Sequence, residues 1–305
     1  MGRNMKKIIG FLIFVIMLLN AASLQAQNTP SQISDEQAHE IVLNGTPDDV
    51  KKLIQSGYDV NKVYQCNTLL NTAIKSILNI QNFGDKAPQY AVEKLKYLIS
   101  LGADVNQETC TDNARIPLTL VLKIPMEMRG LELIAEQAME EELNNKSGYC
   151  DIDGLISKPC KEVTEDEEKL LKSLVHQSFD KTKKNFVPYL MEMMKILVSN
   201  GADVNKKDTI RNRSPLHHAV ELPSKLTTEP LIYLIHNGAN VNAKDINGDT
   251  PLFFAAGLNN NDAVRILISA GADTNIRNNE GLLYNQVIGY QNYKTIQQIK
   301  NQFNG

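Results

Sequence analysis

Three histidines are the residues of this sequence whose types and spacing come nearest to a metal site. His217 and His218 are adjacent, and His236 follows in the next predicted helix. Imidazole nitrogens bind zinc, but a zinc site needs about three or four converging ligands. The sequence shows no further ligand cluster beside these histidines, so we predict no metal site here.

Two aspartates alternate in the manner of calcium ligands. Asp151 and Asp153 lack the rest of the twelve-residue calcium loop with its closing Glu, so we expect a solvated acidic loop. The sequence contains no glycine-rich phosphate loop and no G-x-S-x-G motif. It therefore predicts a protein that is not an enzyme and has no cofactor, and a catalytic pair of Cys and His is the alternative left open.

The first 26 residues have the order of a secretory signal peptide. Their start is basic, residues 8–19 are apolar or glycine, and small residues follow up to Ala26. A run of this length is too short to cross a bilayer comfortably. We expect cleavage after Ala26, with cleavage after Ser23 and an uncleaved membrane anchor as alternatives. The mature chain, 27–305, is then exported to the periplasm or secreted, with no membrane association.

Charge restricts the class of partner. The first 26 residues contain three basic side chains and no acidic one, so the remainder has 29 basic against 35 acidic residues, a net charge of −6. A broad basic face for a polyanion is not expected from that balance. We therefore predict no nucleic-acid partner.

A five-residue phrase, G-A-D-V-N at residues 201–205, recurs with small changes along the chain and indicates the architecture. Two neighbouring copies begin at Gly238 and Gly271, 33 residues apart, and such a period indicates a repeat array. The Gly that begins each copy follows an apolar helical pattern. Gly is the residue best suited to the left-handed turn after a helix. The copies of the phrase lie at residues 57–61, 102–106, 201–205, 238–242 and 271–275.

A second motif follows the first in register. Residues 214–219 read S-P-L-H-H-A and residues 250–255 read T-P-L-F-F-A, with looser copies at 68–73 and 116–121. On these two motifs the chain resembles the ankyrin repeat family over about residues 33–303. The resemblance implies helix–turn–helix units joined by hairpin-like fingers, and it implies that His217 bonds backbone groups.

The predicted fold is an all-α ankyrin-repeat solenoid of about six helix–turn–helix units. An α-helical insert of about residues 125–187 enlarges the third unit, and the alternative is a seventh, degenerate repeat within it. Between Met126 and Glu168 there are 13 acidic and four basic residues, which indicates either a docking face or a solvated one. The units span about 33–61, 67–106, 115–205, 214–242, 250–275 and, as a terminal cap, 281–303.

The four cysteines fit disulfides better than a metal site. An even number permits disulfides in an exported protein, and sequence alone allows three pairings. We predict Cys150–Cys160, because Gly154 and Pro159 can turn the chain between them. We also predict Cys66–Cys110, which would join the fingers of neighbouring repeats.

The resemblance implies a protein that binds another protein through a concave surface of fingers and first helices. We expect a monomer, and the alternatives are a periplasmic helper of a haem or metal enzyme and a toxin-blocking immunity protein. The predicted contact residues share exposed positions on the concave side: Tyr64, Arg211, Arg213, His218, Glu221, Ile246, Asn247, Phe254 and Leu258.

Overall fold

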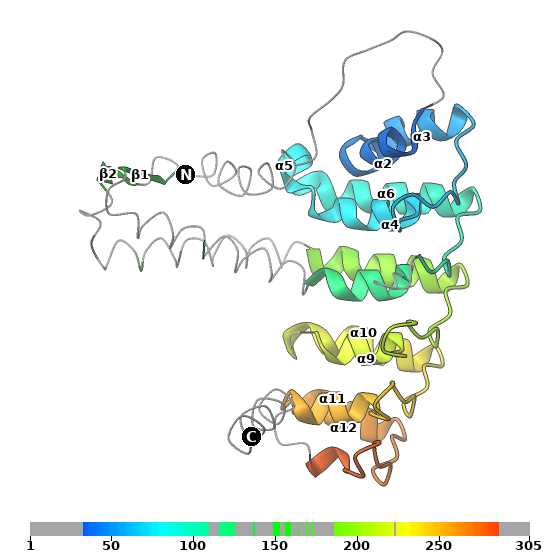
Figure 1. The fold of residues 1–305 in the computed structure, drawn as a ribbon, viewed down its shortest axis with the longest axis vertical. Helices are drawn as coiled ribbons and strands as arrows, with labels where there is room; N and C mark the ends of the chain where they lie inside the picture. The colour runs from blue at the N-terminus through cyan, green and yellow to red at the C-terminus, as the bar shows by residue number, and fades with distance from the viewer. Residues whose placement is uncertain are drawn as a thin grey trace, which may run out of the picture.

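The computed structural model shows a column of stacked layers that are built from pairs of helices (Figure 1). It describes residues 33–109, 116–125, 186–222 and 224–286, two short strands at 149–152 and 156–159, and the single residues Gln137, Thr164, Lys169 and Ser173. The all-α solenoid that the sequence predicts is confirmed for these layers.

The helix pairs follow one another in chain order. They are α2 (Asp35–Asn44) with α3 (Pro47–Gln55), α4 (Leu69–Lys75) with α6 (Ala87–Ser100), residues 117–125 with 186–199, α9 (Pro215–Val220) with α10 (Ser224–His236), and α11 (Pro251–Gly257) with α12 (Asn261–Ser269). Between α4 and α6 the chain forms η1 (Ser76–Leu78), α5 (Ile80–Phe83) and η2 (Gly84–Lys86). The last predicted unit begins with η5 (Tyr284–Gln286).

Local sequence explains why the helices begin where they do. At α3, Thr46 accepts a hydrogen bond from the Asp49 N–H, and the Asp49 side chain accepts one from the Thr46 N–H. Pro47 occupies the first helical position, where no N–H is needed. Val50 and Leu53 then point into the core, so one short segment supplies both a capped start and an apolar face.

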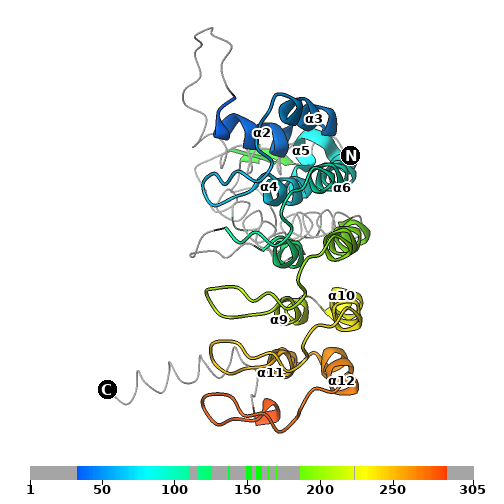
Figure 2. The ribbon, with the colours of Figure 1, turned by 90° about the vertical axis from the view of Figure 1, so that its right-hand side faces the viewer.

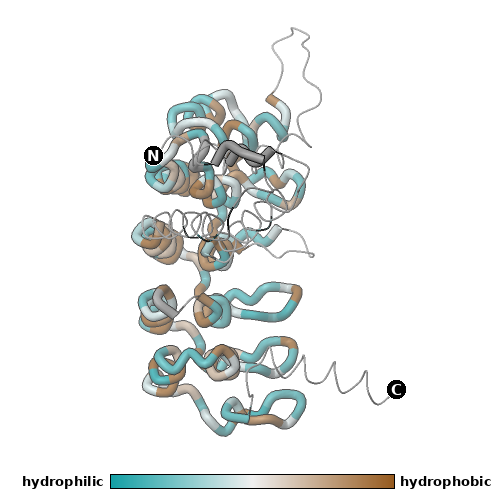
Figure 3. Tube along the Cα trace, turned by 90° about the vertical axis from the view of Figure 1, so that its left-hand side faces the viewer, coloured by the Kyte–Doolittle hydropathy of each residue, from teal (hydrophilic) through white to brown (hydrophobic). Residues whose placement is uncertain are grey.

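The apolar faces of the two helix columns meet along the length of the solenoid. Figure 2 shows α4, α9 and α11 in an inner column that bears the fingers, and α6, α10 and α12 in an outer column. Hydrophobic residues gather where the columns face each other (Figure 3). Leu216 in α9, Leu252 in α11 and Leu267 in α12 are each at most 1% exposed there.

The glycines of the recurring phrase stop the outer helices. Gly238 has φ +86° and Gly271 has φ +90°, a region that side chains with a Cβ rarely adopt. No atom lies within 4 Å of a Cβ built at either position. The glycine is therefore required by the left-handed backbone and not by lack of space, as the sequence predicts for a helix stop.

The asparagine that ends the phrase clips each layer to the next. Asn205 donates from Nδ2 to the Gly238 carbonyl over 2.9 Å, and its Oδ1 accepts from the Asn240 N–H at 2.7 Å. Asparagines of the other copies make the same pair of bonds: Asn61, Asn106 and Asn242. The phrase is thus a structural joint, without chemistry of its own.

The same clip crosses the long insert. Asn106 bonds the carbonyl of Gly201 and the N–H of Asp203, each at 2.8 Å, although about 95 residues separate them in sequence. The second and third layers therefore stack directly. Among the described residues, no further layer lies between the copies at 102–106 and 201–205, and the choice between an insert and a seventh repeat stays a prediction.

The insert contains strands that the sequence analysis did not predict. β1 (Tyr149–Ile152) and β2 (Ile156–Pro159) pair antiparallel, with Cys150 opposite Lys158. The α-helical insert that the sequence predicts thus also contains a hairpin, which was not expected because backbone pairing in a hairpin needs no helical apolar stripe. Most of the predicted insert, about residues 125–187, lies outside the described residues.

Two further predictions also fall on residues that the structure does not describe. These are the signal peptide at 1–26 and the cap beyond residue 286. Within the described part of the chain, no helix combines the length and apolar content that crossing a bilayer requires.

Candidate partner-binding surface

Three consecutive fingers form one continuous ribbon beside the inner helices. They span residues 206–213, 243–249 and 276–282. A backbone bond closes each hairpin, for example Asp245 N–H to the Asp249 carbonyl at 2.9 Å. Neighbouring fingers are joined in turn, because the Ile246 N–H donates to the Arg211 carbonyl over 2.9 Å. The ribbon is therefore a preorganised surface whose backbone needs no partner to hold its shape.

The tips of the first two fingers expose apolar side chains next to one another. Ile246 is 60% exposed and Ile210 is 42% exposed. Arg211 and Asn247 beside them are also exposed. We call Ile210, Arg211, Ile246 and Asn247 the finger patch; Figure 3 shows the hydrophobic tips on otherwise hydrophilic loops.

The structure separates the predicted contact residues into exposed and buried ones. Arg211, Ile246, Asn247 and Leu258 are exposed, and their role in binding stays a prediction. Ile210 was not among the predicted contact residues. Its signal in the sequence is an apolar residue at the tip of a finger that is one residue longer than the next finger. Tyr64 is half-buried in the first finger, near the His39 ring, and lies layers away from the finger patch.

The expected exposure of three contact residues was wrong. Arg213 is 7%, His218 5% and Phe254 6% exposed, and Glu221 is mostly buried. The physical reason is that the fingers and the next layer cover the base of each finger. These four buried residues therefore lie at the base of the fingers and support the finger patch.

The buried residues form a charged cluster under the fingers. Arg213 pairs with Glu221 at 2.8 Å and lies 3.7 Å from Asp245. The His218 ring bridges two carboxylates, with Nε2 3.1 Å from Asp208 and Nδ1 3.4 Å from Glu221. The cluster ties the base of two fingers to the inner helix α9.

The surroundings of the carboxylates keep them ionised. Burial by itself would raise the pKa of Asp208, but hydrogen bonds from His218 and from the Arg211 N–H lower it to about 2. Burial would also raise the pKa of Glu221, and bonding to His218 and the charge of Arg213 lower it. Both groups therefore remain negative at neutral pH, and Glu221 compensates the buried Arg213 guanidinium.

Phe254 is a core residue that joins two layers. The Arg213 guanidinium carbon lies 4.4 Å from the centre of its ring, a cation–π contact. The His217 ring packs edge-on against it, with ring centres 5.4 Å apart. A change at Phe254 would therefore disturb stability and is unsuited to testing binding.

His217 performs the structural role that its motif implied. The Ser214 N–H donates to Nδ1 at 3.1 Å, which makes Nδ1 an acceptor and places the ring proton on Nε2. Nε2 then donates to the Asp249 carbonyl of the next finger at 3.2 Å. Burial in this neutral form lowers the pKa of His217 to about 4.

We expect acidification to destabilise the fold through His217. Its pKa is about 4 when folded and about 6.5 when unfolded. Between these values only the unfolded chain binds the proton. Neutral His217 thus contributes about 3 kcal/mol to the free energy of unfolding. This contribution is fully present above about pH 6.5 and is lost as the pH falls towards 4.

The pH effect can be measured by urea unfolding at pH 7 and at pH 4.5. A His217→Gln variant should have a lower free energy of unfolding than the parent at pH 7. Its free energy of unfolding should fall less than that of the parent when the pH is lowered to 4.5. The matched control is His236→Gln, because His236 is exposed on α10. An unchanged pH dependence in His217→Gln would contradict the role given to this ring.

The structure tests only part of the predictions about cysteines and metal sites. Cys66 is disulfide-bonded. Its predicted partner Cys110 lies outside the described residues, as does Cys160, so both pairings stay predictions. Within the described ranges, no group of three or more His, Cys, Asp or Glu side chains is arranged to hold a metal ion.

These layers, clips and fingers define a helical repeat protein of the solenoid type, with its exposed apolar side chains on the finger edge. Comparison with known proteins names the repeat. Residues 186–278 match the family model for ankyrin repeats in three copies. The chain therefore contains ankyrin repeats, and the resemblance drawn from the two motifs is confirmed.

Part of the chain is similar to segments of several known proteins. The chain is 38% identical over 96 residues to the human ankyrin repeat and SOCS box protein 6, covering 30% of this chain and 22% of that protein. It is 35% identical over 109 residues to ankyrin repeat protein OPG189 of Variola virus, covering 36% and 19%. A mouse B-cell lymphoma 3 protein homolog is 40% identical over 87 residues, covering 28% and 19%. The chain thus matches only about a fifth of the length of these relatives.

Proposed function

We propose that this chain is a non-catalytic module that binds another protein through the finger patch. Ankyrin repeats imply a protein-interaction module, and the particular surface is our own inference. The observation that supports it is the pair of exposed isoleucines, Ile210 and Ile246, on fingers already hydrogen-bonded to each other. Apolar tips on a rigid ribbon can be buried by a partner at little conformational cost.

Each isoleucine is a candidate anchor for a partner. Burying an exposed aliphatic side chain fully is worth about 1.5–3 kcal/mol. Arg211 and Asn247 flank the pair and can hydrogen-bond at the rim. Leu258 is 46% exposed on the first turn after α11 and can extend the contact.

The test is capture of a partner by the mature chain, followed by its identification by mass spectrometry. We expect Ile246→Ser to weaken the captured complex about tenfold or more, since most of one aliphatic burial is lost. Ile268→Ser is the matched control, because Ile268 is 41% exposed on the outer helix α12. Equal affinity of Ile246→Ser and the parent would refute the finger patch, provided that both fold.

We further propose that the protein is exported to the periplasm or secreted, without remaining in the membrane. The basic, apolar and small-residue order of residues 3–26 supports this, and the disulfide at Cys66 is consistent with an oxidising compartment. N-terminal sequencing of the protein from a bacterial host should begin at or near Gln27. Recovery of the intact apolar segment from the membrane fraction would contradict export.

The alternative role as helper of a haem or metal enzyme has less support. That role would use a reachable axial ligand such as His218, whereas the structure places this ring between Asp208 and Glu221, 5% exposed. A toxin-blocking immunity protein would use the same finger patch as any other binding module. The identity of the captured partner distinguishes it.

A further inference from the structure

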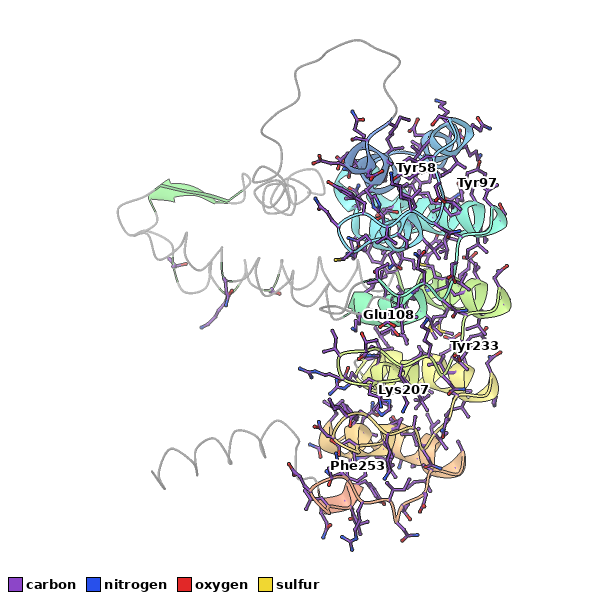
Figure 4. The ribbon with its side chains drawn as sticks, turned by 45° about the vertical axis from the view of Figure 1, so that its right-hand side comes forward. Tyr58, Tyr97, Glu108, Lys207, Tyr233 and Phe253 are labelled. Atoms are coloured by element: carbon purple, nitrogen blue, oxygen red, sulfur yellow. The ribbon has the colours of Figure 1, made fainter. Side chains whose placement is uncertain are left out.

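A column of cations runs along the finger ribbon beside the finger patch. The second residue after the asparagine that ends each copy of the phrase occupies the same place in its finger. From the first finger to the last these residues are Val63, Glu108, Lys207, Lys244 and Arg277. Glu108 and Lys207 lie in successive layers in Figure 4. The column is therefore apolar, then acidic, and then basic over its last three positions.

Hydrogen bonds hold the three cations in place without neutralising them. Lys207 Nζ donates to the Lys244 carbonyl over 2.8 Å, and Lys244 Nζ lies 3.5 Å from the Arg277 carbonyl. Arg277 donates to the Gly281 carbonyl over 2.6 Å. A carbonyl is neutral, so each full positive charge persists, and among the described residues none of the three forms a salt bridge.

The local charge contrasts with that of the chain as a whole, which has a net charge of −3. Among the acidic residues of the three fingers, Asp208 faces His218 and Asp245 is buried near Arg213. Lys244 and Arg277 are exposed, and so is Arg211 in the finger patch. Glu280 is the exposed acidic residue in the same fingers.

We propose that the fingers select an acidic segment of a partner protein that carries apolar side chains between its carboxylates. This inference rests on the proposed function and adds the chemistry of the partner. The cations attract the carboxylates, and Ile210 and Ile246 take the apolar groups. A nucleic acid would match the charges but would leave the exposed isoleucines without an apolar counterpart.

The distance between layers predicts how far apart the carboxylates of the partner segment should be. Packed helices lie about 8–10 Å apart, so successive cations are separated by about that distance. A segment in the polyproline II conformation advances about 3.1 Å per residue with three residues per turn, so every third side chain lies on the same face. A carboxylate at every third residue of such a segment would therefore meet successive members of the column.

The test is an NMR titration of the mature protein with a peptide that has Glu at every third position and Leu among the residues between. A matched peptide has Gln in place of each Glu. We expect the acidic peptide to bind about tenfold more tightly at low salt and to shift amides of the three fingers, with the difference lost at high salt. Equal binding of the two peptides would overturn the proposal.

Protein variants locate the effect. Lys207→Gln, Lys244→Gln and Arg277→Gln combined should abolish the preference for the acidic peptide. The control combines Lys52→Gln, Lys96→Gln and Lys195→Gln, which remove the same charge from the outer helices and should keep the preference. An equal loss in both variants would reject the column, and so would a single-stranded oligonucleotide that binds as tightly as the acidic peptide.

The two proposals fail in different ways. If capture of the natural partner depends on Ile246 and not on the three cations, the finger patch stands and the acidic-segment inference is rejected. If capture does not depend on Ile246, the proposed function fails, whatever the peptides do.

Discussion

Replacing Leu267 by Ala is expected to lower the free energy of unfolding by about 2–5 kcal/mol. Leu267 is 0% exposed in α12, where it faces the core between the two helix columns. Truncation removes buried methyl groups and leaves a cavity that the short helices of a repeat can close only partly. Urea or guanidinium unfolding of the two proteins measures the difference.

The neighbouring residue provides the control for this prediction. Ile268 is adjacent in sequence on the same helix but is 41% exposed. Ile268→Ala should therefore change the stability by only about 0.5 kcal/mol. Equal losses at the two positions would show that the helix presents a different face to the core than the structure has.

Replacing Arg213 by Met is expected to cost about 3–5 kcal/mol, because it leaves buried carboxylates without their cation. The Asp245 side chain is fully buried and the Glu221 side chain is 20% exposed, so water cannot replace the guanidinium at either group. The cation–π contact with Phe254 is lost in the same change. Denaturant unfolding at neutral pH, where Glu221 is ionised, measures the loss.

Arg211 offers a control within the same finger, two residues away. Its side chain is exposed, so Arg211→Met should alter stability by about 0.5 kcal/mol or less. The stability of Arg213→Lys should lie between those of Arg213→Met and Arg211→Met. An ammonium keeps the charge but lacks the planar fork that faces two carboxylates. If Arg213→Met matched the parent in stability, the cluster would have another source of compensation.

The sequence by itself determined the repeat and its local geometry. A glycine after an apolar helical pattern dictates a left-handed stop, and Gly238 and Gly271 adopt it. Pro215 and Pro251 start the inner helices. These features are local, because each depends on backbone preferences within one unit.

Only the tertiary structure decided which polar residues of the fingers are free to bind. Arg211 and Arg213 are alike in type and two residues apart, yet one is exposed and the other is buried against Asp245 of the next finger. The outcome depends on how one layer covers another, and a single repeat does not contain that information. For the same reason the asparagine clips and the column of cations became visible only when the layers were stacked.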